Sequence, residues 1–133
     1  MQLLFENEYL TAEYDSQRDV LYLRRTTTPM PGPEELPELF SQLLRALASY
    51  AGKPLLLDLR PGRGNNSPDF ERAMKEQSLR LRAVFSNTVT LVRTCTGLLH
   101  VQRMARERGE RAPRIFTDEA EAIANLEAGR EGC

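Results

Sequence analysis

The chain has 133 residues, 41% of them hydrophobic and 28% charged, and a formal net charge of −1. This length fits one domain with one core, and the composition is that of an ordinary globular protein that needs no metal or disulfide to fold. The small net charge excludes a strong overall attraction to nucleic acid.

The charges are unevenly distributed along the chain. Residues 60–114 carry 12 basic and 5 acidic side chains, whereas acidic side chains outnumber basic ones on both sides. We favour solvated helix faces as the explanation, and a basic surface is the alternative. The start of the chain shows no signal-peptide pattern, and no apolar run approaches the ~18 residues that span a bilayer. We therefore expect a cytoplasmic protein.

The N-terminal third predicts a β-hairpin followed by a helix. Residues 8–14 alternate between apolar and polar side chains, residues 20–24 are rich in strand formers, and turn residues separate the two segments. Leu3–Phe5 either extend the first strand or form a lead-in. From Pro33 onward, apolar residues recur at three- and four-residue spacing, which is typical of an amphipathic helix, and Gly52 is its expected C-terminal cap.

The rest of the chain alternates strands with helices. The expected strands are residues 54–59, 88–92 and 114–116, and the helices begin at Ser67-Pro68-Asp69, at Thr94 or Thr96, and at Thr117 or Asp118. Crossover helices favour parallel pairing of the strands they join. We therefore expect one α/β domain over residues 1–133, with a mixed sheet of about five strands, an antiparallel N-terminal hairpin and four helices mainly on one face. Residues 1–7 and 129–133 are expected to be frayed.

The element order and several short motifs resemble the STAS family, typified by bacterial anti-sigma factor antagonists. The segment LLLDLR at residues 55–60 leads into a loop and a capped helix, and residues 92–103 are similar to small uncharacterised members of the STAS/CRAL-TRIO group. The ending, residues 114–124, resembles the lipid-carrier-like relatives in that group. The resemblance covers residues 8–128. It implies a STAS-like fold and a regulatory role.

The resemblance also implies a phosphorylation site at Ser67. In the family, the helix after the central strand often begins with a serine or threonine that a partner kinase phosphorylates. Here Asn66-Ser67-Pro68-Asp69 replaces the usual Asp-Ser pattern followed by glycine. A phosphate on Ser67 would meet free N–H groups and the positive end of the helix dipole, although Asp69 would repel it. The favoured alternative is a plain N-cap serine, which stabilises a helix by about 1 kcal/mol.

A second set of candidates lies at the carboxyl ends of two strands. Open α/β sheets bind ligands there, and glycines let backbone N–H groups converge on an anion. No Gly-Lys-Ser/Thr follows, so the loop is not a P-loop, and an ordinary flexible loop is the favoured alternative. The candidates for binding a partner or an anion are Asp58, Arg60, Arg63, Gly64, Asn65, Asn66, Asp69, Arg93, Thr94 and Thr96.

The sequence predicts neither catalysis nor metal binding. Cys95 follows Arg93 at a helix start, where a thiol pKa can be lowered. We expect the one histidine, His100, to point outward, so a structural cysteine is favoured over a Cys/His pair. One histidine with two distant cysteines cannot form an ordinary zinc site. We expect no enzymatic activity, no cofactor and no metal.

These observations favour a non-catalytic protein-interaction or regulatory module that docks a regulator or kinase through residues 60–72. One alternative is a carrier of a lipid or small apolar molecule, which requires an apolar pocket between sheet and helices. Another is a weak anion or nucleic-acid binder that uses the basic middle of the chain. We expect no membrane association, and a homodimer is the default oligomer for a small domain.

Overall fold

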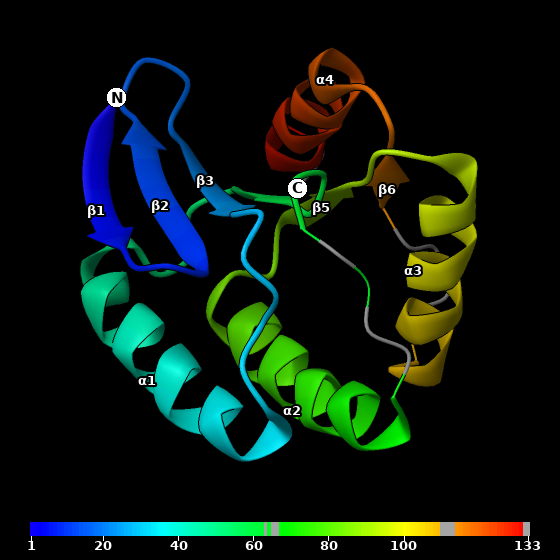
Figure 1. Ribbon diagram of the computed structural model, residues 1–133. Coiled ribbons are helices and arrows are strands. Elements are labelled where there is room, and N and C mark those ends of the chain that lie inside the picture. Colours follow the sequence, from blue (N-terminus) through cyan, green and yellow to red (C-terminus); the bar gives the residue numbers. More distant parts are fainter. Residues whose placement is uncertain (63, 65–66, 110–113, 132–133) are drawn as a thin grey trace.

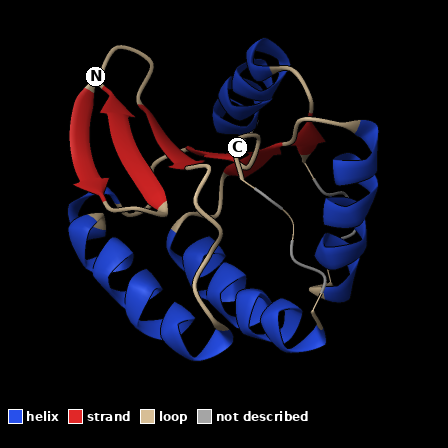
Figure 2. Ribbon diagram, viewed as in Figure 1, coloured by secondary structure: helices blue, strands red, loops and turns tan. Residues whose placement is uncertain are grey.

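The computed structural model describes residues 1–62, 64, 67–109 and 114–131, and shows a six-stranded mixed β-sheet flanked by helices (Figures 1 and 2). The strands lie in sequence order across the sheet. They are β1 (Gln2–Glu6), β2 (Leu10–Asp15), β3 (Val20–Arg25), β4 (Leu55–Asp58), β5 (Thr88–Leu91) and β6 (Ile115–Phe116). The helices are α1 (Leu36–Ala46), α2 (Pro68–Val84), α3 (Cys95–Glu107) and α4 (Glu119–Glu131), with short 3-10 helices η1 (Pro33–Glu35) and η2 (Ala48–Tyr50). The predicted mixed α/β fold is confirmed.

Both ends of the chain differ from the expectation of fraying. β1 pairs with β2 in antiparallel fashion, and its Leu4 and Phe5 pack against the core, so residues 2–6 form a sixth strand. Backbone pairing and apolar burial together hold this strand in place. At the other end, α4 continues to Glu131, within the expected frayed segment 129–133, and residues 132–133 lie outside the described residues.

The turn between β2 and β3 shows why the predicted hairpin forms. Oδ1 of Asp15 accepts the backbone N–H groups of Gln17 at 3.0 Å and Arg18 at 3.2 Å. Asp19 then adopts a positive φ of 58°, a conformation that short polar residues tolerate better than most. The local turn chemistry therefore sets the pairing of the two strands.

Strands β3 to β6 are parallel, and a helical segment joins each one to the next. Because every crossover advances in the same direction and such crossovers are right-handed, α1, α2 and α3 are expected on one face. α1 and α2 lie on that face, and α3 lies beside β6 (Figure 1). α4 packs on the opposite face against β4, β5 and β6. The prediction of four helices mainly on one face therefore has one exception, α4.

Two hydrophobic clusters explain why both faces of the sheet are covered. Side chains alternate along a strand, so Leu21 and Leu23 of β3 join the cluster with α1 and α2, while Val20 and Tyr22 join the cluster with α4. All four are buried. A strand whose neighbouring residues are all apolar needs cover on both faces, and α4 supplies the second cover.

Capping residues set the helix starts near the candidate site. Thr94 accepts the backbone N–H of Gly97 at 3.0 Å, so Thr94 is the cap of α3. At the start of α4, Oδ2 of Asp118 accepts the N–H of Glu121 at 3.1 Å. Ser67 directly precedes α2, as predicted, but its side chain makes no capping hydrogen bond.

Candidate functional site

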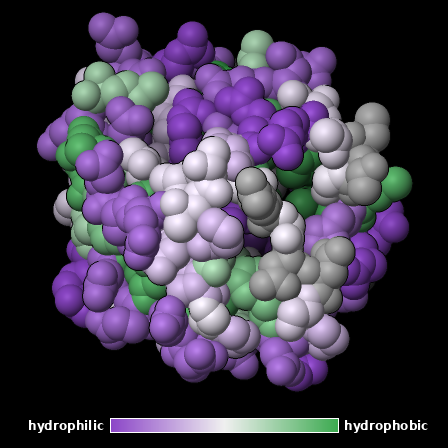
Figure 3. Space-filling model, viewed as in Figure 1, coloured by the Kyte–Doolittle hydropathy of each residue, from purple (hydrophilic) through white to green (hydrophobic). Residues whose placement is uncertain are grey.

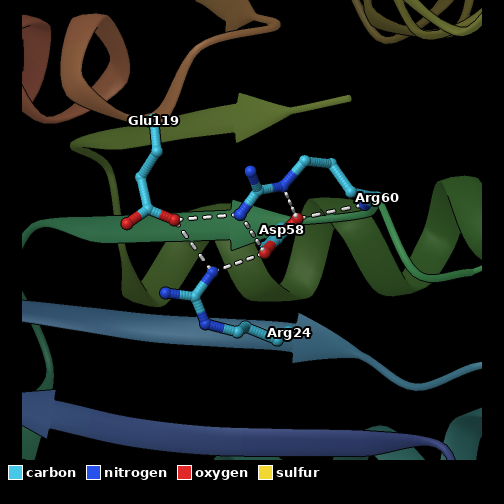
Figure 4. Close-up of polar contacts among 4 residues, drawn as sticks. All are labelled: Arg24, Asp58, Arg60 and Glu119. Carbon is cyan, nitrogen blue, oxygen red and sulfur yellow. Dashed lines mark hydrogen bonds and ion pairs between the residues drawn. The ribbon is translucent and has the colours of Figure 1, made fainter. Parts of the chain in front are cut away.

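The carboxyl end of β4 carries an ion-pair network (Figure 4). Arg60 donates three hydrogen bonds to the carboxylate of Asp58, from its backbone N–H at 3.0 Å, Nε at 2.9 Å and Nη2 at 3.0 Å. Arg24 also donates to Asp58. Oε1 of Glu119 accepts from Arg24 at 3.1 Å and from Arg60 at 3.0 Å. The network therefore connects β3, β4 and the first turn of α4.

The electrostatics of Asp58 match a structural role. Asp58 is only 2% exposed. Burial alone would raise the pKa of its carboxyl, but the hydrogen bonds from Arg60 and Arg24 outweigh burial and hold the pKa below its ordinary value. Arg24 also lies over the ring of Tyr22, with Cζ 4.9 Å from the ring centre. Asp58 and Arg60, both predicted to bind a partner or an anion, bind each other, and their role in binding a partner stays a prediction.

Two members of the network, Arg24 and Glu119, were not among the predicted site residues. Glu119 lies in the first turn of a helix, where the helix dipole already accounts for an acidic residue. Arg24 follows four buried residues of β3, and strand alternation places it on the same face as Tyr22. That alternation was the available signal that this arginine points toward α4.

The loop after β4 lies close to Arg25. Arg63, Asn65 and Asn66, all predicted site residues, lie outside the described residues, and Gly64 is exposed. A Cβ added at Gly62 would collide with the guanidinium of Arg25, whereas a Cβ at Gly64 would meet nothing within 4 Å. Glycine at position 62 therefore allows the Arg25 guanidinium to pack against the loop.

The start of α2 is accessible to a partner. Ser67, Pro68 and Asp69 are exposed. The carbonyl of Ser67 accepts the N–H of Glu71 at 2.9 Å, and Asp69 forms an ion pair with Arg72 one helical turn later. The position of the predicted phosphoacceptor is thus on the surface, and its phosphorylation stays a prediction.

The predicted residues after β5 lie at the rim of a pocket. Arg93 and Thr94 are exposed and belong to the pocket lining. The side chains of Cys95 and Thr96 lie outside the described part of the structure, although their backbones begin α3.

His100, which the sequence predicts to point outward, is half-buried and also belongs to the pocket lining. Three- and four-residue spacing places His100 on the same face of α3 as three other lining residues, Gly97, Val101 and Met104. Nδ1 of His100 lies 3.3 Å from Nη2 of Arg103. The helical spacing could have revealed this orientation.

The pocket has a volume of about 310 Å³ and lies between α2, α3 and the face of the sheet. Its lining is mostly apolar and includes Leu57, Val92, Phe70, Met74, Val101 and Met104. Figure 3 shows small hydrophobic patches in the middle of this side of the molecule, with mostly hydrophilic side chains around them. The sequence did not locate the pocket because its walls come from segments that are far apart in the chain.

An ion pair joins the two helices that flank the pocket. Nη2 of Arg103 on α3 donates to Oε1 of Glu71 on α2 at 3.0 Å. The hydrogen bond to Glu71 raises the pKa of Arg103 above its ordinary value. This contact helps to set the spacing between α2 and α3.

No protein-family model, curated protein or solved structure compared with the chain matches it. The resemblance to the STAS family therefore stays a prediction based on element order and motifs. Among the described residues, no helix combines the length and hydrophobicity that crossing a bilayer requires. Within the same part of the chain, no three His, Cys, Asp or Glu side chains are grouped in a way that could hold a metal ion.

Proposed function

We propose that this chain is a non-catalytic binding module that holds a small apolar molecule in the pocket between α2 and α3. The pocket itself carries the proposal. Its volume of about 310 Å³ and its mostly apolar lining are typical of small-molecule sites, which span roughly 300–1,000 Å³. It also lies beside the carboxyl ends of parallel strands, where open α/β sheets bind ligands.

The chemistry near the pocket favours binding over bond making. Asp58 is not among the described pocket-lining residues; it lies on the opposite face of the sheet, where two arginines enclose its carboxylate and lower its pKa, so it is a weak base. Arginine stays protonated under physiological conditions, so the arginines that line the pocket serve poorly as general acids or bases. The lining arginines can orient and stabilise a ligand.

Amide NMR of isotopically labelled protein tests the proposal, with octanol as an uncharged probe. We expect saturable shifts that cluster on α2 and α3. Val101→Phe fills the pocket and should abolish them, whereas Leu99→Phe, on the same helix at a residue that is 66% exposed, should leave them unchanged. Shifts that never saturate, or that persist in Val101→Phe, would reject the pocket as a binding site.

A second candidate function is docking of a protein partner through residues 60–72. The exposure of Ser67, Pro68 and Asp69 at the start of α2 favours it. A photo-crosslinking residue at position 69 should capture a defined partner in cells, and Ser67→Asp should reduce that capture. The same crosslinker at exposed position 79, further along α2, is the control. Equal capture at both positions would argue against a docking surface at residues 60–72.

A further inference from the structure

The charged side chains among the described lining residues of the pocket are all of one sign. Its lining includes arginines from β3, from α2, from the residue that follows α3 and from the segments after β4 and β5, and no aspartate or glutamate occurs among the described lining residues. The arginines are Arg25, Arg60, Arg82, Arg93 and Arg108. A cavity with apolar walls and a positive rim attracts molecules that combine an apolar body with an anionic group.

The arginines differ in how far their charge is already balanced. Arg60 is paired with Asp58 and Glu119. Arg93 is exposed and forms no hydrogen bond or ion pair with the described residues. An incoming anion therefore meets available positive charge at Arg93 and much less at Arg60.

Strand order places Arg25 at the same end of the pocket as Arg93. Arg25 ends β3, Arg93 follows β5 by two residues, and the two strands flank β4 in the parallel part of the sheet. Both arginines therefore lie beside the carboxyl end of β4. Arg25 is half-buried, and burial lowers the pKa of its guanidinium.

We propose that the pocket binds a medium-chain carboxylate, with its head group at Arg93 and Arg25 and its alkyl chain between α2 and α3. The inference rests on the proposed function and specifies its ligand. At the exposed rim the carboxylate keeps part of its hydration, whereas the chain is removed from water among Phe70, Met74 and Met104. The planar guanidinium matches a carboxylate with two parallel hydrogen bonds.

The size of the cavity sets the length of the chain. A volume of about 310 Å³ lies at the lower end of the range for small-molecule sites, roughly 300–1,000 Å³. A long-chain lipid would extend beyond these walls into water. Octanoate is therefore a suitable probe, and octanol and octylamine are matched probes that carry a neutral and a cationic head group.

Isothermal titration calorimetry with these three probes tests the head-group assignment. We expect octanoate to bind about tenfold more tightly than octanol, because a hydrogen bond to a charged group adds to the burial of the chain. Octylamine should bind most weakly. Added salt should reduce the advantage of octanoate because Arg93 is exposed to solvent.

Arg93→Gln should remove most of the advantage of octanoate and leave octanol binding unchanged. Because Arg93 is exposed, this variant should fold normally. Arg72→Gln is the control, since Arg72 is exposed on α2 and does not line the pocket.

The outcomes separate the two proposals. Equal affinity for octanoate and octanol would overturn the carboxylate assignment and leave the binding module standing. Unchanged octanoate affinity in Arg93→Gln would overturn the role of Arg93. No binding of either probe would overturn the proposed function itself.

Discussion

Arg24 and Arg25 are neighbours in the chain, but β3 directs them to opposite faces of the sheet and into opposite environments. On the α4 face, Arg24 binds two carboxylates, those of Asp58 and Glu119. On the other face, Arg25 lines an apolar pocket whose charged lining residues, among those described, are arginines. The first site balances its charges within the fold, whereas the second is the site where we propose that a ligand binds.

The largest expected effect tests the structural half of this comparison. Asp58→Ala should lower the free energy of unfolding by about 3 kcal/mol, because it leaves the partly buried guanidinium groups of Arg24 and Arg60 without their shared carboxylate. Urea denaturation measures the change. Asp69→Ala is the matched control and should stay within about 0.5 kcal/mol, since Asp69 is exposed. Similar losses in both variants would show that the network adds little to stability.

The next effect is a pH dependence. The pKa of Asp58 is lower in the folded state than its ordinary value of about 3.9, so its ionised form stabilises the fold. That contribution is fully present above the ordinary value and is lost as the pH falls through the folded value. The stability difference between the wild type and Asp58→Asn, about 2 kcal/mol at neutral pH, should therefore shrink on acidification below about pH 4. A difference that stays constant down to about pH 2 would contradict this assignment.

A smaller effect tests the role of Arg25 in the proposed ligand site. Gly62→Ala places a Cβ against the Arg25 guanidinium, which must move, and octanoate affinity should fall about fivefold. Stability should change by less than about 1 kcal/mol because the guanidinium is the end of a flexible side chain. Gly64→Ala, where a Cβ meets open space, is the matched control in the same loop. Equal octanoate affinities of the two variants, measured by calorimetry, would show that Arg25 does not contribute to octanoate binding.

The smallest effects distinguish the two helix starts near the pocket. Thr94→Ala should lower the free energy of unfolding by about 1 kcal/mol, because it removes the hydrogen bond to the N–H of Gly97. Ser67→Ala should change it by less than about 0.5 kcal/mol, because Ser67 makes no capping hydrogen bond. Thermal denaturation of both variants checks this order. A greater loss in Ser67→Ala would assign Ser67 a structural role.

The elements that depend on local chemistry were predictable. Turn residues at Asp15–Asp19 indicated the hairpin, Ser67-Pro68 indicated the start of α2, and Thr94 was one of two expected caps of α3. In each case the deciding contacts span a few residues, so the pattern is readable from one segment. The strand β1 was ambiguous because a short edge strand depends on its partner for pairing.

The two sites themselves required the tertiary structure. The parallel register of β3 and β4 sets Arg24 opposite Asp58, and the return of α4 over the second face brings Glu119 to both. The pocket likewise depends on the spacing of α2 and α3, helices that follow different strands. The spacing of apolar residues along each segment indicated which segments form strands and which form helices, because that spacing follows from backbone geometry. The pairing of charges and the shape of the cavity followed only from packing, since each joins residues that are distant along the chain.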